Sequence, residues 1–211
     1  GAEQALTGDL SSIDETKALA DQVNALGEFD AVIHNAGIGY QERTRGKTAD
    51  GLPAVFAVNT LAPYVLTALL LKPKRLVYLG SSMHRSGDAT LRDLEWKTRH
   101  WDGSQAYSDS KLHDVILAFA VARLWPSVLS NAVDPGWVPT KMGGRGAPDD
   151  LSKGAETQAW LAVSDDPAAR VTGEYFYHER PRAVHPAARD PHVQGVLLDA
   201  CARISSVALP A

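Results

Sequence analysis

Apolar residues along the chain follow two patterns, and each pattern predicts one kind of element. Short continuous apolar runs predict buried strands, and they lie at 29–33, 76–79, 128–133 and 175–177, with a further short run at 5–7. Segments in which apolar residues recur with helical spacing predict helices, and these cover 12–27, 52–71, 106–124, 151–163 and 192–204. Because apolar strands alternate with helices, we predict an α/β fold, a doubly wound parallel sheet with helices on both faces.

Small and polar residues follow the predicted strands, at Gly8-Asp9, Asn35-Ala36-Gly37, Ser81-Ser82 and Pro135-Gly136. The carboxyl ends of parallel strands meet at one edge of a sheet, and ligands of such sheets bind beyond that edge. We therefore expect these clusters to converge on one site. No internal repeat or linker divides residues 1–211, so a single domain is expected.

Composition excludes several classes of protein. With 211 residues, 45% hydrophobic and 22% charged, the chain can form a core and is not intrinsically disordered. A net charge of −4 without a basic stripe predicts no nucleic-acid partner. Cys201 is the only cysteine, so no disulfide forms within the chain and a reduced, cytoplasmic location is expected. The longest apolar stretch, 61–71, is too short to span a bilayer, and residues 1–8 do not resemble a signal peptide.

Tyr107 and Lys111 are four positions apart in a predicted helix, which places the phenol and the ammonium on one helix face. A positive charge beside a phenol favours the phenolate and lowers a tyrosine pKa from about 10. A tyrosine of this kind can exchange a proton with a carbonyl or alcohol oxygen. The spacing also arises by chance, so this pair alone predicts little.

Three further positions could complete a site, although each also has an ordinary structural explanation. A hydroxyl of Ser81-Ser82 could hydrogen bond a developing oxyanion, or belong to a simple turn. The small residues of Asn35-Ala36-Gly37 would let a flat ligand lie close to the backbone, or form a turn only. Asn59, a poor helix former inside a predicted helix, is either solvated or buried in a way that bends its helix.

In their order along the chain these residues resemble the short-chain dehydrogenase/reductase family, and the resemblance covers nearly the whole chain. The residues that resemble the catalytic tetrad of the family are Asn59, Ser82, Tyr107 and Lys111. The positions that resemble its cofactor-binding segments are Asp9, Leu10, Asn35, Ala36, Gly37, Tyr107, Lys111, Pro135, Gly136 and Thr140. The spacing of 25 positions from Ser82 to Tyr107 is similar to the spacing in the retinol dehydrogenase and WW-domain oxidoreductase branch of this family.

The resemblance implies a Rossmann-like sheet and hydride transfer between a nicotinamide cofactor and an alcohol or carbonyl substrate. The cofactor would be NADP(H) or NAD(H), with NADP(H) favoured, and no metal is implied. Tyr107 would exchange the proton of the substrate oxygen, which Ser82 would polarise. Lys111 would lower the pKa of Tyr107 and bind the nicotinamide ribose, and Asn59 would help to hold a water that links Lys111 to solvent. The resemblance also implies a homo-oligomer, a dimer formed through the helices at 52–71 and 106–124.

The sequence departs from the family at its beginning, where members have a Gly-rich turn that opens a helix and binds pyrophosphate. The chain begins at what resembles the third strand, so we expect the sheet to lack the first two strands. About fifty to sixty residues of the natural protein would then be absent. A non-catalytic binding or regulatory protein of the same fold, lacking the phosphate-binding loop, is therefore the alternative. A nucleotide-sugar epimerase, which shares the Tyr-x-x-x-Lys motif, is disfavoured by the Asn-Ala-Gly turn.

Aromatic and sulfur-containing residues near the predicted site indicate a small-molecule substrate that is an apolar alcohol or carbonyl compound. They are Tyr40, Met83, Trp96, Trp101 and Trp137. Each could equally well pack in the core or in a covering loop.

Overall fold

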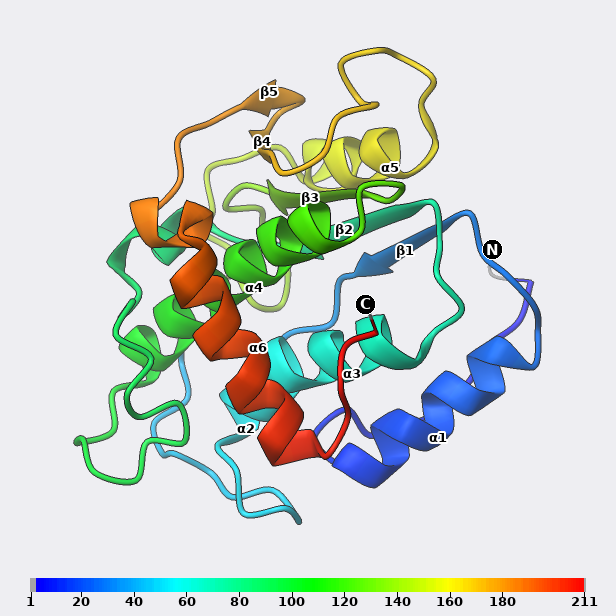
Figure 1. Cartoon of the computed structure of the whole chain (residues 1–211). Coiled ribbons are helices and arrows are strands. Elements are labelled where there is room, and N and C mark those ends of the chain that lie inside the picture. Colours follow the sequence, from blue (N-terminus) through cyan, green and yellow to red (C-terminus); the bar gives the residue numbers. More distant parts are fainter. Residues whose placement is uncertain (1–2, 211) are drawn as a thin grey trace.

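The computed structural model describes residues 3–210, which form a five-stranded sheet with helices on both faces (Figure 1). The strands are β1 (Ala31–His34), β2 (Arg75–Leu79), β3 (Leu129–Asp134), β4 (Tyr175–Tyr177) and β5 (Arg180–Pro181). They lie side by side in this order. The first four strands are parallel, and β5 returns antiparallel to β4. In register, Val77 of β2 lies between Ile33 of β1 and Asn131 of β3.

The helices of the described residues agree closely with the predicted segments. They are α1 (Ile13–Asn24), α2 (Ala54–Phe56), α3 (Ala62–Leu69), α4 (Gly103–Leu124), α5 (Glu156–Val163) and α6 (Pro191–Ser205). A π-helical turn, η1 (Ala57–Leu61), joins α2 to α3 without a break. The 3-10 turns are η2 (Ser82–Ser86), η3 (Leu151–Gly154) and η4 (Pro186–Arg189).

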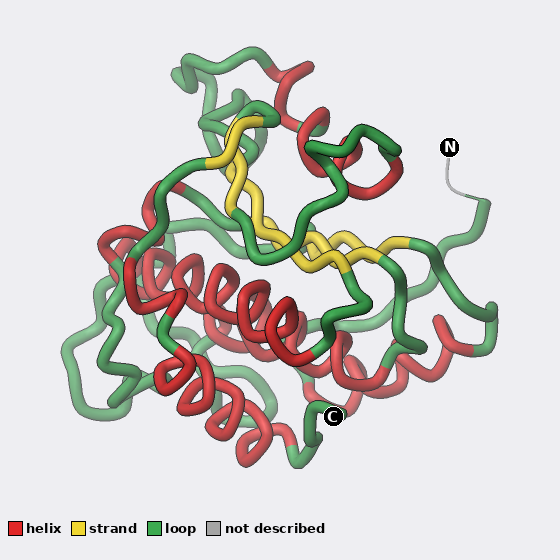
Figure 2. The backbone as a smooth tube through the Cα atoms, turned by 45° about the horizontal axis from the view of Figure 1, so that its top comes forward, coloured by secondary structure: helices red, strands yellow, loops and turns green. Residues whose placement is uncertain are grey.

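The sheet separates two layers of helices, as Figures 1 and 2 show from two directions. Helix α5 packs on one face, and α4 packs on the other against β2 and β3. The terminal helix α6 covers the side of α4 that is turned away from the sheet. As a result every residue from Ala106 to Val121 is buried. This burial corrects the prediction that α4 contributes to a dimer interface, because its outer side is already covered within the chain.

The doubly wound parallel sheet predicted from the sequence is confirmed, but the short strand expected at 5–7 does not form. Leu6 and β1 line a common cleft of about 760 Å³ instead of pairing with each other. Among residues 3–210 no strand lies beside the outer edge of β1. A strand requires a neighbouring backbone for its hydrogen bonds, and the run at 5–7 has none, so it stays irregular.

In the part of the chain that the structure describes, no helix is both long enough and apolar enough to cross a membrane.

Candidate active site

The π-helical turn η1 places Asn59 in the protein interior. The side chain of Asn59 is 1% exposed, which favours the buried alternative over the solvated one. Its Oδ1 accepts from the backbone N–H of Ile38 at 2.7 Å, and its Nδ2 donates to the carbonyl of Ile38 at 3.0 Å. Nδ2 also donates to Ser110 Oγ at 3.0 Å. Asn59 therefore fixes the loop after β1 to α4, and a single π turn within a helix is a frequent feature of functional sites.

Tyr107 and Lys111 lie together on α4, as their spacing predicts. Both are buried, and Lys111 Nζ is 5.6 Å from the centre of the Tyr107 ring. The chain after β1 approaches this pair closely at Gly37. A Cβ built on Gly37 would lie 3.5 Å from Asn59 Oδ1 and 3.9 Å from Lys111 Nζ. The fold thus brings Asn59, Tyr107, Lys111 and Gly37 together from three separate segments.

The net electrostatic effect on Tyr107 differs from the one predicted from the sequence. Burial raises the pKa of the Tyr107 phenol above its usual value, although the ammonium of Lys111 acts in the opposite direction. The carboxylates of Asp114 and Asp134 raise this pKa further, and a hydrogen bond with Ser81 lowers it. The predicted contribution of Lys111 therefore has the expected sign, but burial and two carboxylates outweigh it.

The two adjacent serines after β2 face different surroundings. Ser81 lowers the pKa of the Tyr107 phenol, and its Oγ accepts from the N–H of Met83 at 3.3 Å at the start of η2. Ser82, the residue predicted from the sequence, is exposed and lines a separate hollow of about 250 Å³. The sequence offers no signal to distinguish them, because the choice depends on where β2 ends and η2 begins.

Six of the predicted cofactor-binding residues border three different hollows. Leu10, Asn35 and Ala36 line the cleft beside β1; Gly37 and Thr140 line a hollow of about 520 Å³; Gly136 lines the one that contains Ser82. Pro135 precedes Gly136 directly after β3. The carboxylate of Asp9 accepts from the backbone N–H of Ser11 at 2.8 Å, and this hydrogen bonding lowers its pKa.

The carboxyl edge of the sheet fits the nicotinamide and ribose end of a dinucleotide. Gly37 is exposed and has no side chain, so a ligand could lie against its backbone, and Asn59 Oδ1 and Lys111 Nζ are 3.5 Å and 3.9 Å from where its Cβ would be. Gly136 has φ +85°, and a Cβ there would lie 2.6 Å from Asp149 Oδ2, so the backbone requires glycine. Within residues 3–210 no glycine-rich turn opens a helix directly after a strand. The described residues thus provide no such place for the pyrophosphate.

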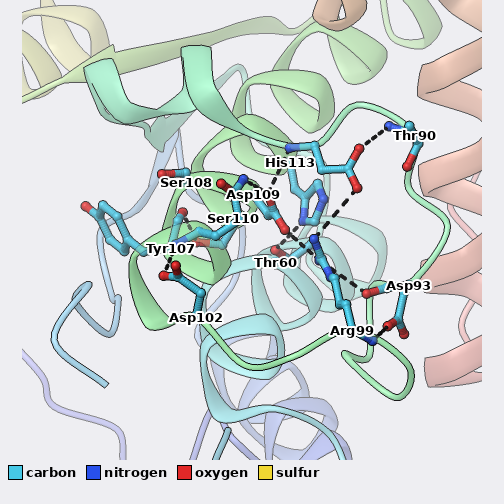
Figure 3. A network of polar contacts seen from close by, with 12 residues as sticks. Thr60, Thr90, Asp93, Arg99, Asp102, Tyr107, Ser108, Asp109, Ser110 and His113 are labelled. Carbon is cyan, nitrogen blue, oxygen red and sulfur yellow. Dashed lines mark hydrogen bonds and ion pairs between the residues drawn. The ribbon is translucent and has the colours of Figure 1, made fainter. Parts of the chain in front are cut away.

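A buried ion pair fixes the segment before α4 onto that helix (Figure 3). The guanidinium of Arg99 donates to Asp109 Oδ2 at 2.6 Å, and the Asp109 side chain is only 3% exposed. The other oxygen, Oδ1, accepts from the backbone N–H of Asp88 at 2.8 Å and from Gln105 Nε2 at 2.7 Å. Asp109 therefore ties α4 to the segments that contain Asp88 and Arg99.

Of the aromatic residues expected around the site, some border it and others do not. Tyr40 packs edge-on against Tyr107 with ring centres 5.8 Å apart. Trp137 is 54% exposed and lines the hollow at the end of β3. Trp96 is buried and packs against Trp101 at 5.0 Å, so this pair stabilises the loop before α4. Among the described residues, no three His, Cys, Asp or Glu side chains could together hold a metal ion.

Comparison with known protein sequences identifies relatives, some of which align with the whole chain. A family model described as enoyl-(acyl carrier protein) reductase matches residues 1–171. An uncharacterized oxidoreductase of Emericella nidulans is 47% identical over 214 residues, which are 100% of this chain and 81% of that protein. The short-chain dehydrogenase chry4 of Gibberella zeae is 39% identical over 100% of this chain and 82% of its own. Human retinol dehydrogenase 13 is 30% identical over 96% of this chain and 68% of its own.

Solved structures share the fold. An NADPH-bound carbonyl reductase from chicken fatty liver superposes with a TM-score of 0.59 at 19% identity, over 83% of this chain and 75% of that one. At this identity the similarity concerns the fold alone, and it agrees with the parallel sheet described above.

Proposed function

The chain belongs to the short-chain dehydrogenase/reductase family of oxidoreductases, and on this premise we propose that it reduces a carbonyl compound with a nicotinamide cofactor. One observation supports the proposal above all others. Gly37, Asn59, Tyr107 and Lys111 come from separate segments, yet they meet at the carboxyl edge of the sheet. Ligands of open α/β sheets bind at this edge.

In this proposal Tyr107 is the residue that exchanges a proton with the substrate oxygen. Burial keeps the phenol protonated at neutral pH, which is the form that donates a proton to a carbonyl oxygen. Lys111 stabilises the phenolate left after the proton has gone, because its ammonium lies on the same helix face. Ser82, the residue predicted from the sequence, would hydrogen bond the substrate oxygen, and it lines the hollow at the end of β3. Ser81, which lowers the pKa of Tyr107, is a second candidate for this role.

Asn59 contributes to the proposed site by holding a loop in place. Each of its side-chain polar groups is bonded to Ile38 or Ser110, so it holds the loop after β1 against α4. The predicted water between Asn59, Lys111 and solvent stays a prediction.

The cofactor, when bound, would supply the hydride. Gly37, Gly136 and Thr140 would border the nicotinamide end, and Lys111 would bind its ribose hydroxyls. Asp9, Leu10, Asn35, Ala36 and Pro135 remain the other positions proposed to contact it. We propose NADP(H) in preference to NAD(H), and the carbonyl reductase of the same fold binds NADPH.

The hollow beside Ser82 is our candidate for the substrate, because Asp134, one of its lining residues, is close enough to Tyr107 to raise the pKa of the phenol. The aromatic side chains of Trp137, Tyr175 and Tyr177 would contact the apolar part of a carbonyl compound there. The rest of the lining includes four charged side chains, those of Arg85, Asp134, Asp149 and Arg182. We also propose a cytoplasmic location and a homo-oligomer.

The test is turnover by the Tyr107→Phe variant. With a panel of aldehydes and ketones, oxidation of NADPH or NADH is followed by the loss of nicotinamide absorbance. We expect Tyr107→Phe to lose more than about a hundredfold in rate, since a positioned proton donor contributes about that much. Tyr64→Phe is the control, because its hydroxyl donates to the carbonyl of Val207 at 2.8 Å, away from the site.

Full turnover in folded Tyr107→Phe would refute the proposal. If neither cofactor changes its nicotinamide fluorescence when the natural protein with an intact amino end is added, the non-catalytic alternative of the same fold is favoured instead.

A further inference from the structure

A buried carboxylate to which the proposed reaction gives no role lies beside Lys111. Asp114, three residues further along α4, accepts a hydrogen bond from Lys111 Nζ at 2.8 Å. The two side chains are only 4% and 7% exposed. The same ammonium donates to the backbone carbonyl of Leu79 at 2.6 Å. A lysine ammonium has three N–H donors, and these two contacts fix its position relative to α4 and β2.

The two buried charges depend on each other. Burial raises the pKa of Asp114 to about 6, although the ammonium of Lys111 opposes this change. Burial by itself would lower the pKa of Lys111, but the Asp114 carboxylate reverses that effect and the pKa is raised. A buried charge without a partner is costly. At neutral pH each group therefore keeps the other ionised.

The pair acts on the phenol with two opposite charges. The ammonium of Lys111 lowers the pKa of Tyr107, and the carboxylate of Asp114 raises it. Asp134 of β3 also faces this cluster and raises the same pKa. Tyr78 of β2 is fully buried beside Asp114, and burial raises its pKa, so it remains neutral. Removal of the Asp114 charge alone would leave the ammonium unopposed.

We propose that Asp114 is a positioning residue that fixes the Lys111 ammonium and limits how strongly it favours the phenolate of Tyr107. This role of Asp114 rests on the proposed function in one respect, that Tyr107 acts as a proton donor. The electrostatic effect itself requires neither cofactor nor substrate. Its consequence for reduction is that the phenol remains in its protonated, donating form.

The test is an alkaline titration of the whole chain, followed by the ultraviolet absorbance of tyrosinate, with circular dichroism to confirm folding at each pH. Subtraction of the Tyr107→Phe curve identifies the contribution of Tyr107. In Asp114→Asn the amide retains an oxygen for the ammonium but has no charge. While Lys111 stays protonated, we expect the midpoint of Tyr107 to fall by about one pH unit, a tenfold rise in the phenolate fraction at a given pH. Loss of the carboxylate also lowers the pKa of the Lys111 ammonium itself.

The matched control is Asp109→Asn, which removes a buried carboxylate from the same helix, but one paired with Arg99. We expect it to leave the midpoint of Tyr107 unchanged. An equal shift in both variants would overturn the proposal. So would an unchanged midpoint both in folded Asp114→Asn and on going from Lys111→Met to Lys111→Met/Asp114→Asn, where the charge of Lys111 plays no part.

If Asp114→Asn does not fold, Lys111→Met is compared with Lys111→Met/Asp114→Asn. The double variant removes both charges of the pair, so no buried charge is left without a partner. The midpoint of Tyr107 must still fall on going from the single to the double variant, and no change would overturn the proposal.

The two proposals fail in different ways. Full turnover by Tyr107→Phe would refute the proposed function and leave the titration shift in place. A missing shift would refute the role of Asp114 and leave the loss of turnover in Tyr107→Phe in place.

Discussion

The variant Asn59→Ala tests whether one side chain holds the loop after β1 in place. It removes three hydrogen bonds, two to the backbone of Ile38 and one to Ser110 Oγ. Each bond contributes about 1 kcal/mol, and part of the cost is recovered because Ile38 is half-buried and can meet water. Alanine also has a higher helix propensity, which returns about 0.5 kcal/mol. We expect the free energy of unfolding to fall by about 2 kcal/mol.

For a chain of 211 residues, this loss corresponds to a decrease in Tm of about 4–8 °C. Urea unfolding gives the free energy, and amide hydrogen exchange shows where the structure opens. We expect faster exchange in residues 35–42, because their link to α4 is lost.

The matched control is Asn131→Ala. Asn131 is also a buried asparagine, but it bonds the backbone of Val171 at 2.7 Å and of Glu174 at 3.0 Å. We expect a similar loss of stability without faster exchange at 35–42. If Asn59→Ala loses less than about 0.5 kcal/mol and exchange at 35–42 is unchanged, the loop is held by other contacts and the reasoning is wrong.

Two further predictions concern acid stability and a backbone turn. Burial lowers the pKa of His34 and of His113 to about 4, so the unfolded chain takes up protons at higher pH than the folded protein. The contribution of these two histidines to the free energy of unfolding should therefore be complete above their usual pKa of 6.5. It should be lost as the pH decreases toward 4. Urea unfolding at several pH values in this range checks it, and a flat dependence would contradict it. Gly136→Ala places a Cβ 2.6 Å from Asp149 Oδ2 at a φ of +85°, and should cost more than about 1 kcal/mol. Gly144→Ala, at φ +77° with nothing within 4 Å, should cost less, so equal costs in thermal unfolding would show that the close contact is unimportant.

The sequence alone determined the elements and the central pair of the site. Helices and strands follow from local periodicity, and α4 and β3 form within a few residues of their predicted ends. The spacing of Tyr107 and Lys111 places them on one face of any helix, whatever surrounds it. Asn59 could be identified as unusual because asparagine is a poor helix former.

Tertiary structure decided the properties that depend on neighbours distant in sequence. The apolar run at 5–7 has a strand-like sequence but no partner strand, so it does not pair. Ser82 is exposed and lines the hollow at the end of β3 because the 3-10 turn η2 begins at this residue, soon after β2. The pKa of Tyr107 is raised because α4 is covered on both sides and the Asp114 and Asp134 carboxylates lie near it. Spacing along the chain fixes which groups are neighbours on one element, whereas burial and charge depend on how the elements pack.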